Sequence, residues 1–395
     1  MKMMVCNAGS TSLKFKVYQM PEEKVLAVGG VERVGSLDDA VFKYSNAIEG
    51  KSITLSKVSI PSYQRGIEMF LSYLTEGEHK AFDSIGEIKA VGFKTVLAKG
   101  YYGVHELDDD VLEGMREWYP LAPIHNKAYL ESIAAMKSVL PGVRMIGAFE
   151  TAFHTTIPID RKMYGIPYEW YEKYGIQRLG FHGASHSYIA SVLDKRLGEY
   201  KAVSCHLGGS GSICAIENGK SVDTSFGLSL ETGLIHAKRV GDMDPTMVFF
   251  LEEMGLTKEE IKEALTNNGG LLGISGVSGD LRYIEKAAEE GNSRAKLALD
   301  VFIRGIIHYV ASFAADMGGL DALVFTAGIG EHSPYIRRRV VELLSIFGLE
   351  LDEKANEEGK EVISTPSSPV KIMVIPTDEE IVVARKSVEY ISSHQ

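Results

Sequence analysis

The chain has 395 residues, enough for two or three domains of about 100–200 residues each. With 45% hydrophobic and 24% charged residues it has the composition of a soluble globular protein, and its net charge of −11 argues against non-specific binding to nucleic acid or anionic membranes. No apolar run approaches the roughly 20 residues of a membrane span, and residues 1–6 lack the apolar core of a signal peptide. Three cysteines without metal-ligand spacing are typical of reduced thiols, so we expect a cytoplasmic protein.

The first predicted elements are two strands joined by small polar residues, in VCNAGSTSLKFKVY (residues 5–18). The connection is longer than a two-residue hairpin turn requires. It contains an amide, three hydroxyls and a lysine, which suit a loop that wraps an anion with N–H, O–H and ammonium donors. An ordinary polar hairpin is the alternative interpretation.

A second segment repeats this design about two hundred residues later, in AVSCHLGGSGSICAIENGKSVDTSFG (residues 202–227). It too predicts strand, small-residue loop and strand, and Asn218-Gly219 is a strong signal for the next tight turn. Two such hairpins suggest two related halves, although β-hairpins are common enough for a chance likeness.

Strands and helices alternate between and after the hairpins. Residues 144–151, 322–330 and 370–377 contain buried strands, and residues 293–317 form a long amphipathic helix. This alternation predicts an α/β protein whose sheets are covered on both faces, with a domain boundary near residues 150–155.

Two strand ends carry residues that suit a phosphate or a metal. Before a helix predicted near Pro334, the glycines of Gly328-Ile329-Gly330 let the backbone approach an anionic ligand closely. The carboxylates of residues 378–380 either cap the following helix or offer oxygen ligands to Mg²⁺. No Walker-type phosphate loop occurs, which argues against a P-loop NTPase.

Six of the eleven histidines lie between residues 120 and 240, namely His125, His154, His182, His186, His206 and His236. Glycines flank the Phe181-His182 pair and would expose the imidazole, so we favour a functional role for His182 and structural roles for His154 and His186. No carboxylate completes a zinc ligand set with His182 and His186.

The motifs together resemble one family. VCNAGSTSLKFKV and GFHGASHSY resemble the two signatures of the acetate kinase family, and the likeness continues in family order through LAPIHN, ETAFH, HLGGSGS, GKSVDTSFG, RVGDMDP, FTAGIGE and TDEEIVVAR. The resemblance implies two similar ribonuclease H-like domains of the actin/Hsp70 type with an interdomain cleft. Residues 1–152 with 382–395 would bind the acyl group and phosphate, and residues 153–381 would bind the nucleotide.

The resemblance also implies the activity. A homodimer would use ATP with Mg²⁺ or Mn²⁺ to phosphorylate acetate or propionate by direct in-line transfer, giving acyl phosphate and ADP reversibly. Neither nucleic acid nor membrane would be a partner.

Roles carry over residue by residue from the same resemblance. Asn7 and Glu379 would hold the metal, and the catalytic residues would be Lys14, His125, Glu150, His182 and Arg239. The acyl substrate would contact Lys94, Val96, Ile124, Phe181, Leu230 and Arg239. The nucleotide and its phosphates would contact Ser10, Ser12, Lys14, His206, Gly208, Gly209, Ser210, Gly211, Asp280, Arg282, Gly328, Ile329 and Gly330.

The chain departs from the family pattern mainly near the expected acyl pocket. GFKTVLAKG (residues 92–100) stands where the family usually has GHRVVHGGE, and SLETGL (residues 229–234) stands for TPLEGL. The changed positions are Lys94, Leu97, Glu150, Leu230, Glu231, Thr232 and Lys238. Lysine lacks the bidentate fork of arginine, so the change at Lys94 is not conservative.

Three hypotheses therefore remain. The chain is a working acetate or propionate kinase, a kinase for a larger or more polar carboxylate, or a non-catalytic nucleotide-binding paralogue. Retention of Asn7, Lys14, His182, Arg239 and Glu379 argues against the third. A sugar kinase would need an aspartate base, and the sequence identifies none.

Overall fold

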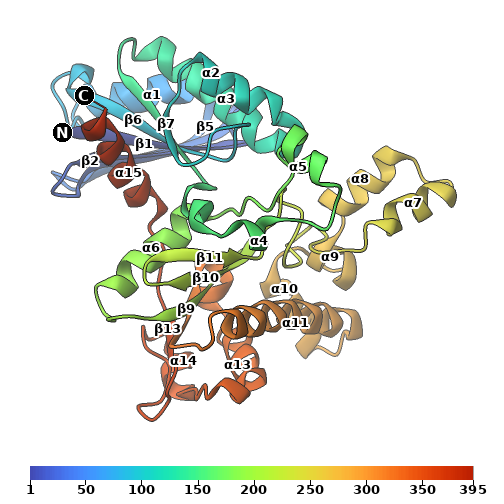
Figure 1. The fold of residues 1–395 in the computed structure, drawn as a ribbon. Coiled ribbons are helices and arrows are strands. Elements are labelled where there is room, and N and C mark those ends of the chain that lie inside the picture. Colours follow the sequence, from blue (N-terminus) through green and yellow to red (C-terminus); the bar gives the residue numbers. More distant parts are fainter. Residues whose placement is uncertain (395) are drawn as a thin grey trace. The chain divides into compact units, whose positions relative to one another are not determined.

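The computed structural model describes residues 1–394, which form two compact units: Met1–Ala152 with Asp378–Gln395, and Phe153–Thr377. Figure 1 shows the two sheets and the helices around each. Each unit contains one mixed sheet, as the alternation of predicted strands and helices indicated.

The first unit contains an eight-stranded sheet in the order β5-β4-β3-β2-β1-β6-β8-β7. Its strands are β1 (Lys2–Gly9), β2 (Ser12–Gln19), β3 (Lys24–Glu32), β4 (Ser36–Asn46), β5 (Lys51–Ile60), β6 (Ile88–Thr95), β7 (Val104–Glu106) and β8 (Arg144–Phe149). Its helices are α1 (Tyr63–Thr75), α2 (Asp109–Glu117), α3 (Pro123–Val139) and α15 (Glu379–Ser393), with 3₁₀ turns at Ile85–Glu87 and Tyr119–Leu121. Alternation along β2 directs Phe15 to α1, where it stacks on Phe70, and directs Lys16 to Asp378, the N-cap of α15.

The second unit contains a five-stranded sheet in the order β11-β10-β9-β12-β13. Its strands are β9 (Lys201–Leu207), β10 (Gly211–Glu217), β11 (Lys220–Thr224), β12 (Ala322–Thr326) and β13 (Lys371–Val374). Its helices are α4 (Ile159–Lys162), α5 (Tyr168–Tyr174), α6 (Gly183–Asp194), α7 (Thr246–Glu253), α8 (Lys258–Asn267), α9 (Gly270–Ser275), α10 (Leu281–Glu289), α11 (Ser293–Asp316), α12 (Ala327–His332), α13 (Pro334–Leu343) and α14 (Glu353–Glu357), with 3₁₀ turns at Ala152–Thr156 and Ser345–Phe347.

The two sheets share one topology. In the first, β1, β2 and β3 are antiparallel neighbours, and β6 and then β8 extend the sheet parallel to β1. In the second, β9, β10 and β11 repeat the antiparallel meander, and β12 and β13 repeat the parallel extension. The hairpin repeat seen in the sequence is therefore a repeat of five strands.

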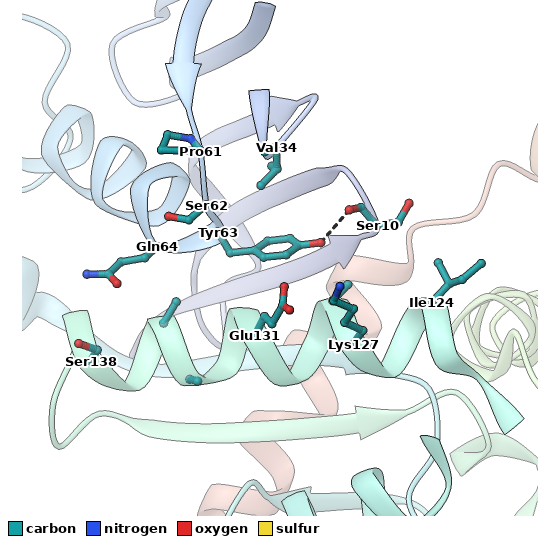
Figure 2. A pocket seen from close by; sticks show the side chains of 14 residues that line it. Ser10, Val34, Pro61, Ser62, Tyr63, Gln64, Ile124, Lys127, Glu131 and Ser138 are labelled. Atoms are coloured by element: carbon teal, nitrogen blue, oxygen red, sulfur yellow. Dashed lines mark hydrogen bonds between the residues drawn. The ribbon is translucent and has the colours of Figure 1, made fainter. Parts of the chain in front are cut away.

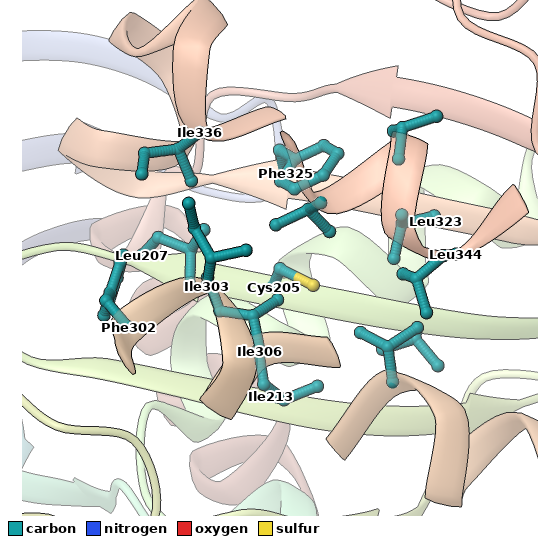
Figure 3. Close-up of a cluster of buried hydrophobic side chains, with 14 of the residues drawn as sticks. Cys205, Leu207, Ile213, Phe302, Ile303, Ile306, Leu323, Phe325, Ile336 and Leu344 are labelled. Carbon is teal, nitrogen blue, oxygen red and sulfur yellow. The ribbon is translucent and has the colours of Figure 1, made fainter. Parts of the chain in front are cut away.

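The main core of the second unit lies on one face of its sheet (Figure 3). Phe302, Ile303 and Ile306 of α11 pack there against Cys205 and Ile213 of the sheet. Each such side chain contributes about 1.5–3 kcal/mol on burial. By length and composition alone α11 could cross a membrane, and one face of it packs into the core of the second unit.

Two local expectations are wrong. β1 and β2 pair continuously as far as Gly9 and Ser12, so only Ser10 and Thr11 form the first turn, and Asn7 is a strand residue opposite Lys14. Gly328, Ile329 and Gly330 lie inside the short helix α12 and not in an open turn. The chain enters this helix directly from β12, because Ala327 adopts a left-handed φ of 63°.

Candidate functional site

In the first unit, the candidate residues gather at the carboxyl ends of three parallel strands. Asn7 lies near the end of β1, Lys94 near the end of β6, and Glu150 directly after β8. Glu379 is the first residue of α15, whose N-cap is Asp378. Carboxyl ends of parallel strands are the usual ligand-binding edge of an α/β sheet.

Lys94 joins two of the carboxylates in this group. Its ammonium group donates a hydrogen bond to Glu379 and lies 3.8 Å from Oε2 of Glu150. Burial alone would lower the pKa of Lys94, but the carboxylates of Glu150 and Glu379 raise it, so the side chain is charged at neutral pH.

Tyr129 of α3 is a member of this group that the sequence analysis missed. Its hydroxyl donates to Oδ1 of Asn7 at 3.0 Å and so fixes the amide of that residue. Burial raises the pKa of Tyr129, which keeps the hydroxyl a donor. Nothing local in the helix sequence marks this tyrosine, because the contact spans 122 residues.

The donor set of this edge fits a hard divalent cation. Asn7, Glu150 and Glu379 offer amide and carboxylate oxygens, and the two carboxylates converge on one lysine cation, which leaves a net negative charge. Mg²⁺ is usually held by one or two carboxylates together with water and substrate phosphates, so a full cage of protein ligands is not required. Among the described residues no group of three or more His, Cys, Asp or Glu could form such a cage.

The remaining first-unit candidates lie around this edge without joining the lysine–carboxylate group. Ser12 and Lys14 are on β2, and Val96 is buried directly after β6. Ile124 and His125 are exposed in the first turn of α3. Ser10 and Ile124 line a cavity of about 760 Å³ between the first hairpin, α1 and α3 (Figure 2), where the Tyr63 hydroxyl donates to the Ser10 carbonyl at 3.0 Å.

In the second unit, a cavity of about 680 Å³ brings together segments that are far apart in the sequence. Of the predicted nucleotide residues it is lined by Gly208, Gly209, Asp280, Arg282, Gly328 and Ile329. His206, Ser210, Gly211 and Gly330 are not among its lining residues, whereas Lys238, Gly279 and Glu285, which the nucleotide prediction lacked, are.

Backbone geometry explains the glycines of this cavity. A Cβ on Gly279 would lie 2.9 Å from the Ala237 carbonyl oxygen, so only glycine allows these two segments to approach. A Cβ on Gly328 would meet nothing within 4 Å, which leaves the backbone there open to a ligand.

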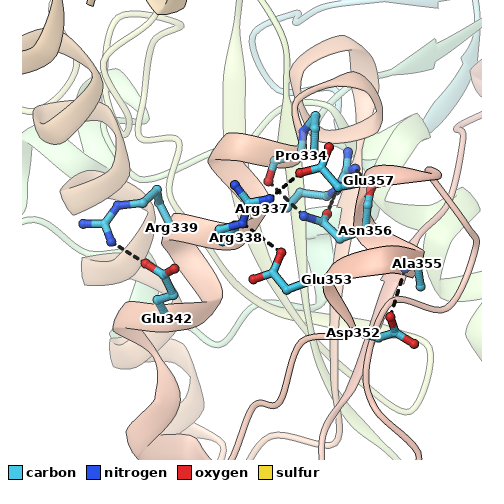
Figure 4. A network of polar contacts seen from close by, with 10 residues as sticks. All are labelled: Pro334, Arg337, Arg338, Arg339, Glu342, Asp352, Glu353, Ala355, Asn356 and Glu357. Atoms are coloured by element: carbon cyan, nitrogen blue, oxygen red, sulfur yellow. Dashed lines mark hydrogen bonds and ion pairs between the residues drawn. The ribbon is translucent and has the colours of Figure 1, made fainter. Parts of the chain in front are cut away.

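A buried arginine supports the helix that carries Gly328 and Gly330 (Figure 4). Arg337 donates to the carbonyl oxygens of Gly330 and Glu331 at 3.0 and 2.9 Å, which satisfies carbonyls at the end of α12. It also donates to the side-chain and main-chain oxygens of Asn356, both at 2.7 Å. Burial lowers the pKa of Arg337, although the group remains a cation.

The turn after β9 connects this cavity to Arg239. Nη2 of Arg239 donates to Oγ of Ser210 at 2.6 Å. Burial lowers the pKa of Arg239 and the negative charge of Glu231 opposes that effect, so these two side chains lie close enough to interact electrostatically. Burial raises the pKa of Glu231, and its Oε2 has no hydrogen-bond partner among the described residues.

The histidines form a cluster beside this turn. The rings of His182 and His206 stack with centroids 4.0 Å apart, and Nδ1 of His206 is 2.8 Å from Oγ of Ser185. His182 precedes α6 with a φ of 55°, a left-handed conformation that is costly for a residue with a Cβ. Phe181 and Leu230 are buried in the same unit.

His154 and His186, for which we expected structural roles, are completely buried. Nε2 of His154 lies 2.9 Å from the Phe181 carbonyl oxygen and Nδ1 lies 2.8 Å from Oγ of Ser221. Burial lowers the pKa of His154 to about 4, so it is neutral in the folded protein. His186 binds Ser204 and Ser212, two serines that the site prediction omitted.

Comparisons of the sequence and of the structure with known proteins agree with one another. A family model described as the acetokinase family matches residues 2–385. The acetate kinase of Shouchella clausii is 44% identical over 399 residues, covering 99% of this chain and 100% of that protein, and the acetate kinase of Halothermothrix orenii is 41% identical over 401 residues, covering all of both. Among solved structures, the acetate kinase of Porphyromonas gingivalis has a TM-score of 0.87 at 38% identity and 99% coverage of both chains. A propionate kinase from Francisella tularensis has a TM-score of 0.89 at 32% identity and 98% coverage of both.

Proposed function

This chain belongs to the acetokinase family, and we propose that it transfers the γ-phosphoryl group of ATP to acetate or propionate, giving an acyl phosphate and ADP. The observation that carries the proposal is the second-unit cavity, in which glycine-rich segments from three regions converge beside the turn that binds Arg239. The transfer is direct, in line and reversible in this proposal.

The acceptor carboxylate needs no general base from the protein. A short carboxylic acid has a pKa of about 4–5, so at neutral pH it is already an ionised nucleophile. The protein must align donor and acceptor and neutralise the charge that repels them. Arg239 would hold the acceptor carboxylate, and His182 would donate a hydrogen bond to the transferring phosphoryl group.

We assign the nucleotide to the second unit, where Gly208, Gly209, Asp280, Arg282, Gly328 and Ile329 line one cavity. We assign the metal and the phosphate path to the first unit. Asn7 and Glu379, with Glu150 nearby, would hold Mg²⁺ or Mn²⁺, and Lys14 lies opposite Asn7 on the adjacent strand. A bound divalent cation would neutralise phosphate charge during transfer.

One observation favours a second candidate substrate, a larger or more polar carboxylate. Glu231 is a partly buried carboxylate with an oxygen that has no hydrogen-bond partner among the described residues, and it lies near Arg239. A substrate carrying its own hydrogen-bond donor would satisfy that oxygen, whereas acetate would not.

Trapping of acyl phosphate with hydroxylamine tests both candidates. The protein is incubated with ATP, Mg²⁺ and saturating acetate, propionate, butyrate or lactate. Turnover with acetate or propionate supports the first candidate, and turnover only with butyrate or lactate supports the second. No product with any acid, from a protein that still binds ATP, would indicate a non-catalytic paralogue.

We further propose a cytoplasmic homodimer. Helix α7 exposes a group of large apolar side chains for which a second copy of the chain is the proposed partner: Met247, Phe249 and Phe250, with Met254 directly after the helix. Light scattering after size-exclusion chromatography tests this, and Phe249→Glu should convert a dimer into monomer. A wild-type mass equal to one chain would contradict the proposal.

A further inference from the structure

Four side chains form a continuous hydrogen-bonded chain that ends at His182. Oγ of Ser204 is 3.0 Å from Nδ1 of His186, and Nε2 of His186 is 2.8 Å from Oγ of Ser212. The same Ser212 oxygen is 2.8 Å from Nδ1 of His182. Ser204, His186 and Ser212 are completely buried, so water does not substitute for these contacts.

The pleat of the sheet explains why the chain exists. On β9, Val203 and Cys205 face the main core, so Ser204 faces the opposite side, where α6 packs. On β10, Ile213 faces the main core and Ser212 faces α6. Helix α6 then places His186 between the two serines.

The proton positions in this chain follow from its buried end. His186 is neutral, because burial lowers its pKa well below the usual value, so one ring nitrogen donates and the other accepts. If Nδ1 of His186 donated to Ser204, the Ser204 proton would have no acceptor, since His186 is the only hydrogen-bond partner of that hydroxyl in residues 1–394. A buried donor without an acceptor is strongly disfavoured.

The opposite direction gives the Ser204 proton, the His186 N–H and the Ser212 proton one acceptor each. Ser204 donates to Nδ1 of His186, and Nε2–H of His186 donates to Ser212. The single proton of Ser212 is then directed to Nδ1 of His182, whose own proton must lie on Nε2.

We propose that Ser204, His186 and Ser212 are positioning residues that hold His182 in the neutral tautomer protonated on Nε2. In the carboxylate kinase reaction proposed above, on which this role rests, His182 then presents an N–H donor to the transferring group. Phosphoryl oxygens are only acceptors, so the other tautomer would direct a lone pair at them. Stacking on His206 and an edge contact with Phe226 hold the imidazole plane.

Nuclear magnetic resonance of the full chain labelled with ¹⁵N-histidine tests the tautomer directly. Two-bond ¹H–¹⁵N correlations distinguish the protonated ring nitrogen, and His182→Gln identifies the His182 signal by its loss. At pH 7.5 the proposal requires a protonated Nε2 and an unprotonated Nδ1 in His182. The reverse pattern, or the averaged pattern of a free imidazole, would overturn it.

Ser212→Ala removes both contacts of the bridging hydroxyl. We expect the His182 pattern to shift towards an averaged mixture and kcat for acyl phosphate formation to fall by about tenfold or more, with KM for ATP changed less than about twofold. Ser221→Ala is the matched control, because it removes a 2.8 Å serine–histidine contact at His154 outside the chain, and it should leave the His182 spectrum and kcat unchanged. A Ser212→Ala variant with the wild-type spectrum would overturn the proposal, and if that variant does not fold, the wild-type spectrum still decides.

The two proposals fail separately. A protonated Nε2 in a protein that forms no acyl phosphate would support the tautomer assignment and overturn the proposed reaction. Acyl phosphate formation by a protein with His182 protonated on Nδ1 would overturn the tautomer assignment and leave the proposed reaction standing.

Discussion

Lys94 donates a hydrogen bond from its ammonium group to the carboxylate of Glu379, a residue 285 positions later in the chain. The same ammonium lies 3.8 Å from Glu150, so one buried cation compensates two carboxylates of the proposed metal edge. Because the pKa of Lys94 is raised in the folded protein, this stabilisation is present at neutral pH and is lost only at alkaline pH, above the usual lysine value.

Lys94→Met should lower the free energy of unfolding by about 3 kcal/mol, because it leaves two carboxylates without their cation. Urea denaturation measures the loss. Lys99→Met is the control, since the exposed Lys99–Glu117 pair should contribute less than about 1 kcal/mol.

The same Lys94→Met variant tests the metal assignment. If the carboxylates of Glu150 and Glu379 hold the metal, Mg²⁺ should raise the Tm of this variant more than that of the wild type. Equal Mg²⁺ shifts would contradict the metal assignment.

Arg239→Ala should reduce kcat/KM for the carboxylate by about a hundredfold, because the substrate loses its charge-assisted partner. KM for ATP should change by less than about threefold. Steady-state kinetics with each substrate varied in turn provides the measurement. A folded variant in which use of both substrates falls equally would contradict the assignment of Arg239 to the acyl substrate.

Glu231→Leu should change the free energy of unfolding by less than about 1 kcal/mol, because the loss of the attraction to Arg239 opposes the gain from removing a partly buried carboxylate oxygen that lacks a hydrogen bond. The substitution should also raise the turnover of propionate relative to that of lactate in the trapping assay. Glu231→Gln, which keeps the shape and removes the charge, separates charge from volume. Loss of stability in both variants would mean that the carboxylate has a stabilising role.

Buried His154 makes the fold sensitive to acid. Its pKa is lowered to about 4 in the folded protein, so as pH falls below about 6.5 the unfolded chain takes up a proton that the folded chain does not. The free energy of unfolding should therefore fall by about 3 kcal/mol between pH 6.5 and pH 4. Urea titrations at several pH values should show a shallower decline for His154→Gln. An unchanged slope would indicate that other groups govern acid unfolding.

Arg337→Ala should destabilise the second unit by about 3 kcal/mol or more, because the carbonyl oxygens of Gly330 and Glu331 and both oxygens of Asn356 lose their donor in a buried site. Its neighbour Arg338 pairs with Glu353 at 2.8 Å at the surface, so Arg338→Ala should cost less than about 1 kcal/mol. Thermal denaturation compares them. Similar losses in both variants would refute the role of the buried network.

Much of the architecture could be predicted from local patterns. Alternating apolar residues indicated the hairpins, Asn218-Gly219 indicated the turn, and the periodicity of residues 293–317 indicated α11. These predictions succeed because the periods of strands and helices can be recognised within short stretches of sequence. The family motifs indicated the fold class and the kinase family, both of which the comparisons confirm. The first turn was misjudged because small polar residues can continue a strand whose backbone is fully paired.

The α/β class, the family and the residue types available for chemistry depend on composition, periodicity and ordered motifs, all of which are properties of the sequence. Which of those residues meet depends on the fold. Lys94 reaches Glu379, Tyr129 reaches Asn7, and Ser212 joins two histidines only because strand order and register bring separate segments to one edge or one face of a sheet. A shift of one residue in β10 would turn Ser212 into the core and break the chain to His182.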